Sequence, residues 1–322
     1  MRIPGRTRVP AEAALLAARL RRPEIAIVHP FQRGPWGGSN QFLVALRGEL
    51  RRQGFRVEAN AFARTTRACL LNSFLVDEQR LRRGLRPDIR VVHRVDGPVG
   101  TYRGADDGTD LRIADINAEF AHATVFQSRY SLEAHEQLGL HLREPVVIHN
   151  AADPSLFHPP THREPIDGRR IRIVATSWSA HPNKGGATYR WLDKRLDRTR
   201  YEFTFVGRCS EELPHARVVP PVPPRALAEI LRTQDVYLTA SLHESCSNAL
   251  LEALASGLPA LYVDSGANGE LVGDAGRPFH APEELPELLD RLAGELEERR
   301  ARIRIPSLAD VARRYLEIMG AV

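Results

Sequence analysis

Short apolar segments alternate with amphipathic helical segments along almost the whole chain. The segment EIAIVHP, residues 24–30, has the composition of a buried strand, and a glycine-rich loop, a helix from about Ser39 to Gln53 and a second strand follow it. The same alternation continues on both sides of a polar stretch with Pro and Gly, residues 161–170. Such alternation favours parallel sheets covered by helices. We therefore expect an α/β protein with two doubly wound, Rossmann-like domains.

The polar stretch is the best candidate for a linker between the two domains. We expect residues 1–160 to form the first domain and residues 161–306 to form the second. Within the first domain, residues 122–140 predict a strand and an amphipathic helix capped by Ser131. An acidic helix is expected at 282–299, and a final amphipathic helix follows it.

The stretch HESCSNALLEALASGLP, residues 243–259, is the most informative one for function. It predicts a helix whose first turn Ser245 or Ser247 can cap, and the free N–H groups of such a turn bind phosphate well. Glu244 stands just ahead of the helix and Glu252 lies inside it. A carboxylate on each side of a phosphate site suits a nucleotide sugar, with the hexose at one end and the ribose at the other. The alternative is a helix with one first-turn acid and one solvated Glu.

The wider stretch TASLHESCSNALLEALASGLPALYVDSGANGELVGDAG, residues 239–276, resembles the donor-site signature of retaining glycosyltransferases of family 4, the glycosyl transferases group 1. The resemblance extends over roughly residues 24–320. It implies the GT-B fold, in which two domains face each other across a cleft and a C-terminal helix, about 307–322 here, crosses back onto the first. It also implies that Glu244 contacts the donor sugar and that Glu252 binds the ribose hydroxyls.

The same resemblance predicts further donor-binding residues at the helix start and in small-residue loops: Ser245, Ser247, Asn248, Gly266, Ala267, Asn268, Glu270, Gly37 and Gly38. Glu270 could equally be a helix-start acid. In SAHPNKGG, residues 179–186, Lys184 matches one of the two cations that hold the pyrophosphate in the family. Trp178 stands where the family has the other, an Arg, so Arg208 or Arg33 would have to supply it.

The strand expected near residues 89–98 ends in His93, Arg94 and Asp96, at the sheet edge where α/β proteins bind ligands. The family often has a sugar-contacting His at this strand end, and Asp96 matches that position here. We therefore predict catalytic roles for Asp96, Glu244 and Lys184. His93 can equally be a packed strand histidine. Asn150 and Asp153 resemble the family's NG-x-D segment, although a plain turn explains Asp153 better; these two are not assigned to the site.

Composition restricts the compartment and the partners. No apolar run approaches the eighteen residues of a membrane span, and the three cysteines are widely spaced, which predicts neither a disulfide framework nor a metal site. The sequence pI is about 9.4, but the arginines are spread without aromatic interleaving or a nucleic-acid motif. We expect a cytoplasmic protein that does not bind nucleic acid. Peripheral contact with the anionic inner face of the membrane remains an open option.

Together these features predict a retaining glycosyltransferase. It would transfer a hexose from a nucleotide diphosphate sugar to a glycan, lipid-linked or small-molecule acceptor, in cell-surface polysaccharide biosynthesis. We expect neither a cofactor nor a metal, since no Asp-x-Asp stands in a suitable loop. Two alternatives are a sugar-nucleotide epimerase on the same fold and a non-catalytic binder of nucleotide sugars.

Overall fold

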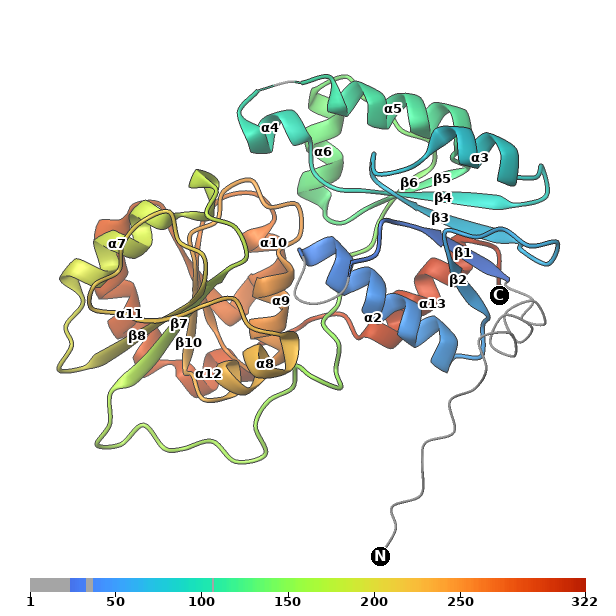
Figure 1. The fold of residues 1–322 in the computed structure, drawn as a ribbon. Helices are drawn as coiled ribbons and strands as arrows, with labels where there is room; N and C mark the ends of the chain where they lie inside the picture. The colour runs from blue at the N-terminus through green and yellow to red at the C-terminus, as the bar shows by residue number, and fades with distance from the viewer. Residues whose placement is uncertain (1–23, 33–36, 106) are drawn as a thin grey trace, which may run out of the picture.

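The computed structural model describes residues 24–32, 37–105 and 107–322. Two six-stranded sheets stand side by side with helices packed around them (Figure 1). Every strand pair in both sheets is parallel. Arg33 and the N-terminal segment up to residue 23 lie outside the described residues. Among the helices of the described part, none has the length and apolar character needed to span a bilayer.

The first sheet has the strand order β2-β1-β3-β4-β5-β6. The order reverses between β1 and β3, as it does in a doubly wound domain. The apolar residues of its central strands are buried, and all four residues of β1 are buried. The strands are β1 (Ile25–Val28), β2 (Val57–Ala59), β3 (Ala68–Asn72), β4 (Arg90–Val95), β5 (Ala123–Phe126) and β6 (Pro145–Val147). The helices between them are α2 (Gly38–Arg52), α3 (Glu78–Gly84), α4 (Val99–Arg103), α5 (Thr109–Phe120) and α6 (Arg129–Gln137).

The second sheet has the order β12-β11-β10-β7-β8-β9, with its reversal between β7 and β10. Its strands are β7 (Ile171–Ser177), β8 (Tyr201–Gly207), β9 (Arg217–Val219), β10 (Val236–Thr239), β11 (Ala260–Val263) and β12 (Gly276–Phe279). Its helices are α7 (Gly186–Arg195), α8 (Pro224–Arg232), α9 (Asn248–Ala255), α10 (Asn268–Val272), α11 (Leu285–Gly294) and α12 (Leu296–Ala301), with 3₁₀ turns η1 (Pro182–Lys184), η2 (Gly273–Ala275) and η3 (Pro282–Glu284). The predicted α/β fold is confirmed.

The last helix, α13 (Leu308–Ile318), crosses back to the first domain and packs against α2 (Figure 1). Its buried residues recur at three- and four-residue spacing and share one core with the apolar face of α2. The first domain thus consists of the first sheet, its helices and α13. The second domain consists of the second sheet and the helices α7 to α12.

Two local predictions were wrong. The cap of α6 is Ser128, whose hydroxyl accepts a hydrogen bond from the N–H of Ser131. Ser131 cannot cap because it is already helical, and its hydroxyl donates instead to the carbonyl of Asp96. The single acidic helix expected at 282–299 is a 3₁₀ turn followed by two helices, since the chain leaves helical geometry at Glu295 (φ −113°).

Candidate active site

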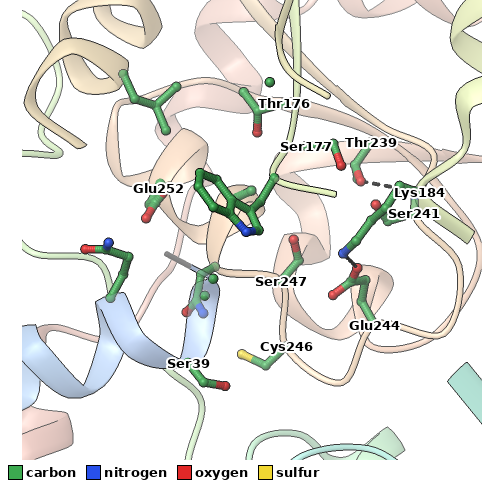
Figure 2. Close-up of a pocket in the computed structure, with 18 of the residues that line it drawn as sticks. Ser39, Thr176, Ser177, Lys184, Thr239, Ser241, Glu244, Cys246, Ser247 and Glu252 are labelled. Carbon is green, nitrogen blue, oxygen red and sulfur yellow. Dashed lines mark hydrogen bonds and ion pairs between the residues drawn. The ribbon is translucent and has the colours of Figure 1, made fainter. Parts of the chain in front are cut away.

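A cavity of about 330 Å³ lies between the two domains, at the carboxyl ends of the central strands (Figure 2). Both domains contribute to its wall. The first domain supplies Gly37, Gly38, Ser39, Gln41, Asp96 and Gln127, and the second supplies Trp178, Lys184, Glu244, Ser245, Ser247, Asn248 and Glu252 among others. This is the topological switch point of both sheets, where open α/β folds bind ligands.

The N-termini of α2 and α9 meet at this cavity. Ser247 caps α9 by accepting a hydrogen bond from the N–H of Leu250 at 3.3 Å, as predicted. The N-cap residue of α2 is Gly37, which has a positive φ and offers no side-chain cap, so the first-turn N–H groups of α2 are available to a ligand. A Cβ on Gly38 would collide with the side-chain amide of Asn248, so glycine permits this close approach of the two helix starts.

Lys184 and Glu244 form an ion pair in the cavity wall (Figure 2). Burial alone would lower the pKa of the Lys184 ammonium, but Glu244 and Tyr102 outweigh that effect and hold the pKa above its usual value. The lysine is therefore charged at neutral pH. It is the one cation among the described residues that line the cavity.

The small-residue loop after β11 supports Glu244 from behind. The N–H of Ala267 donates to the carbonyl of Glu244 at 2.8 Å, and the side chain of Asn268 donates to the carbonyl of Ser241 at 3.0 Å. A Cβ on Gly266 would come within 2.6 Å of the Glu244 backbone, and Gly266 has φ +61°. None of these three residues lines the cavity; they hold the Glu244 loop in place.

Glu252 lies one turn and a half into α9 and faces the cavity (Figure 2). Burial raises the pKa of its carboxyl to about 8. No described residue donates a hydrogen bond to this carboxyl, so its acceptor capacity is left for a ligand. A ribose, with two neighbouring hydroxyls, has the donors that such a carboxylate accepts.

Asp96 lines the first-domain side of the cavity, just after β4, and is half-buried. Its Oδ1 accepts from the side-chain amide of Gln127 and lies 3.4 Å from the Ser39 hydroxyl and 3.5 Å from the Arg94 guanidinium. His93 points elsewhere: it is fully buried, bonded to the carbonyl of Ser73 and to Asn117, and burial lowers its pKa to about 4. His93 is thus a packed strand histidine.

A buried polar network lies beneath Asp96 and was not predicted from the sequence. The guanidinium of Arg94, fully buried, donates to the side-chain oxygens of Asn72 at 2.6 Å and of Asn150 at 3.0 Å. The amide of Asn150 then donates to Gln127 at 2.9 Å and, across the domain boundary, to Asn248 at 3.1 Å. The network ties the cavity edge of the first domain to the start of α9. An Arg near the carboxyl end of a strand whose neighbouring residues are buried was the available signal.

Glu270 and Arg208 do not line the cavity. The Glu270 carboxylate accepts from His149 Nε2 at 2.6 Å and from the N–H of Arg129 at 2.9 Å, so it joins the second domain to the start of α6. Burial would raise the pKa of Glu270, but these hydrogen bonds outweigh it and lower the pKa. The exposed Arg208 stacks on Trp178, its guanidinium carbon 4.8 Å from the ring centre.

Asp153 forms a turn, accepting from the N–H of Ser155 at 2.9 Å.

Within the described residues no three His, Cys, Asp or Glu side chains gather as metal ligands would. The prediction of metal independence stays a prediction.

Residues 188–296 match the family model described as Glycosyl transferases group 1. The match lies wholly within the second domain. The matched residues include Glu244 and Glu252 and the loop that supports Glu244. Comparison with curated proteins gave no match.

Solved glycosyltransferase structures share the whole fold at low sequence identity. HepE from Anabaena, in complex with UDP and glucose, has a TM-score of 0.71 at 14% identity, covering 92% of this chain and 99% of that one. Sucrose-phosphate synthase from Thermosynechococcus elongatus has 0.68 at 15%, covering 93% and 94%. The catalytic domain of starch synthase IV from Arabidopsis thaliana, bound to ADP and acarbose, has 0.68 at 12%, covering 92% and 98%. The chain therefore has the GT-B glycosyltransferase fold.

Proposed function

We propose that this protein is a retaining, metal-independent glycosyltransferase of family 4, which transfers a hexosyl group from a nucleotide diphosphate sugar to an acceptor hydroxyl. One observation carries the proposal: Glu244 with Lys184, and Glu252, stand on either side of the α9 start in one cavity shared by both domains. The group 1 match and the fold support it.

The cavity suits each part of such a donor. Val206, Val222 and Leu227 give it an apolar end fitted to a base, and Glu252 would accept hydrogen bonds from the ribose. The diphosphate would lie at the N-termini of α9 and α2, whose N–H groups and dipoles favour an anion. The hexose would then reach Glu244 and Asp96. HepE binds UDP and glucose, and starch synthase IV binds ADP and a sugar in their respective structures.

In the reaction the bond between the anomeric carbon and the phosphate oxygen breaks, and a bond to the acceptor oxygen forms. The acceptor proton passes to the departing phosphate. Lys184 and the helix starts stabilise the charge on the leaving diphosphate, and Glu244 stabilises positive character on the sugar. Attack from the leaving-group face, as the resemblance implies, needs no protein nucleophile. Asp96 is placed to accept a hydrogen bond from a sugar or acceptor hydroxyl. No cofactor takes part.

For the acceptor we propose a growing glycan, a lipid-linked glycan or a small glycoside of cell-surface polysaccharide synthesis. We propose that the protein acts in the cytoplasm and that it contacts the anionic inner face of the membrane when the acceptor is lipid-linked. The excess of Lys and Arg, 45 against 40 Asp and Glu, is compatible with such contact.

Glu244→Gln tests the catalytic assignment. The variant keeps the shape and one acceptor oxygen but loses the charge, so kcat should fall about 10²- to 10³-fold. Affinity for the free nucleoside diphosphate should hardly change, because that ligand has no sugar. Glu287→Gln, on an exposed face of α11, is the matched control. An unchanged kcat in Glu244→Gln would remove Glu244 from the catalytic machinery.

Nucleotide release, measured with and without acceptor, separates the alternatives. A transferase releases nucleotide diphosphate in proportion to acceptor glycosylated. An epimerase would convert the donor without any acceptor and retain the nucleotide link, and a non-catalytic binder would do neither.

A further inference from the structure

α4 lies on the side of the first domain that faces the second domain (Figure 1), and its residue Tyr102 contacts the η1 turn of the second domain. Tyr102 of α4 contacts three residues of the second domain. Its ring stacks on His181, with centroids 4.9 Å apart and planes 23° apart, and its carbonyl accepts from the side chain of Asn183 at 2.5 Å. The ammonium of Lys184 lies 5.7 Å from the centre of the same ring.

Within its own domain the η1 turn is tied to the Glu244 loop. The carbonyl of Asn183 accepts from the N–H of Leu242 at 2.7 Å, and Lys184 pairs with Glu244. Gly185, φ +78°, follows at once, and a Cβ there would collide with Ala240. The backbone of the turn is therefore fixed. The long flexible stem of Lys184 is fixed only by what surrounds its ammonium, namely Glu244 and the Tyr102 ring.

The chain passes between the domains on the far side of the cleft from α4. Both crossing segments, after β6 and before α13, run beside α2 and α13, whereas α4 stands at the opposite mouth (Figure 1). Opening about those crossings would separate Tyr102 from the η1 turn first. The contacts near the crossings, such as Asn150 with Asn248, would change least.

We propose that Tyr102 is a positioning residue that the first domain supplies to Lys184 when the cleft closes. The negative face of the ring and the phenol hydroxyl both attract the ammonium and limit the lysine to the cavity side, beside Glu244. Lys184 is thereby held where the leaving diphosphate develops charge only in the closed state. The proposal rests on the proposed function insofar as Lys184 acts on that diphosphate.

The test compares Tyr102→Ala and Tyr102→Phe with Arg103→Ala. Arg103, the next residue of α4, is exposed and pairs with Asp107 of its own domain. Tyr102→Ala should lower kcat about tenfold or more, with a smaller change in KM for the donor. Tyr102→Phe should fall between Tyr102→Ala and the parent protein, because it keeps the ring but loses the hydroxyl that bonds Lys184. Arg103→Ala should match the parent protein. Melting temperatures confirm that all three are folded.

A second readout does not depend on activity. Interdomain distance, measured between labels on exposed positions of α5 and α11 without ligand, should lengthen in Tyr102→Ala and stay unchanged in Arg103→Ala. If the parent protein transfers no sugar from any donor but Tyr102→Ala still opens the cleft, the proposed function fails and the contact at α4 stands. Parental kcat in Tyr102→Ala, with or without a changed distance, overturns the positioning role.

Discussion

Replacing Glu252 with Gln should stabilise the empty protein and weaken nucleotide binding. The two effects have one cause. The carboxyl is enclosed in the cavity wall with no described donor, so burial raises its pKa to about 8. In the unfolded chain the same group titrates near 4.5. Between pH 4.5 and pH 8 the Glu252 carboxyl must either take up a proton when the chain folds or be buried with its charge. Both cost free energy.

The size of the effect follows from the pKa difference. A raised folded-state pKa contributes stability that is fully present below about pH 4.5 and is lost as pH rises through about 8. At pH 7, below the folded-state pKa, only the part of this difference between pH 4.5 and pH 7 is lost, which corresponds to ~3.4 kcal/mol. Glu252 faces an open cavity, so water lowers this cost, and we expect ~1 to 2 kcal/mol. The neutral Gln avoids it at every pH.

Nucleotide binding, in contrast to stability, should be weakened by Glu252→Gln. Ribose hydroxyls donate to a carboxylate, and this favours the ionised form of Glu252. Binding to the parent protein at pH 7 should therefore release a proton, and affinity should rise with pH up to about 8. The Gln side chain retains one acceptor oxygen but no charge, so its nucleotide affinity should fall roughly tenfold or more, in line with ~1.5 to 3 kcal/mol for a charged hydrogen bond.

Denaturant unfolding at pH 5, 7 and 8.5 measures the first effect. Calorimetry in buffers of different ionisation enthalpy measures affinity and proton release. Glu229→Gln, exposed on α8, serves as the matched control and should show neither effect. The reasoning is refuted if Glu252→Gln is less stable than the parent at pH 7, or if its stability difference does not grow between pH 5 and 8.5.

Three further predictions follow from the cavity wall. Gly38→Ala should push the Asn248 side chain away from Asn150 and cost ~1 to 3 kcal/mol of stability together with nucleotide affinity, as denaturation and calorimetry will report. Arg94→Met should lower the free energy of unfolding by ~3 to 5 kcal/mol, because it leaves the side-chain oxygens of Asn72 and Asn150 without their buried donor and Asp96 without its buried cation. Sugar transfer should proceed at full rate in excess chelator; a rate that collapses and returns with Mg²⁺ or Mn²⁺ contradicts the metal-independent reading.

The helix that carries the two glutamates could be predicted because its signals are local. Ser247 caps it, and Gly257 ends it with φ +80°. The eight-residue spacing of Glu244 and Glu252 is likewise visible in the sequence alone. The strands could be predicted for a related reason: buried parallel strands are continuous apolar runs, and glycine and polar loops separate them from helices.

The Arg94 network could not be predicted, because its partners are far apart in the sequence. Arg94 meets Asn72 and Asn150, 22 and 56 positions away, and Asn150 meets Asn248, 98 positions away. No local rule pairs them. The Gly266 loop shows a second limit of the sequence: its small residues are typical of an anion site, but the same small size also lets the loop pack against the Glu244 backbone. Its role in donor binding stays a prediction.

Under the proposed function, Trp178 stands where the family resemblance implies a phosphate-binding Arg, and this changes how the cavity would hold a diphosphate. Lys184 is the one cation in the described wall, and Glu244 already offsets its charge. The remaining positive potential comes from the backbone N–H groups at the starts of α9 and α2. Since α2 belongs to the first domain and α9 to the second, this field is complete only when the cleft is closed. If the proposed function holds, the absence of this arginine makes stabilisation of the leaving group depend on domain closure, the same condition under which we propose that Tyr102 reaches Lys184.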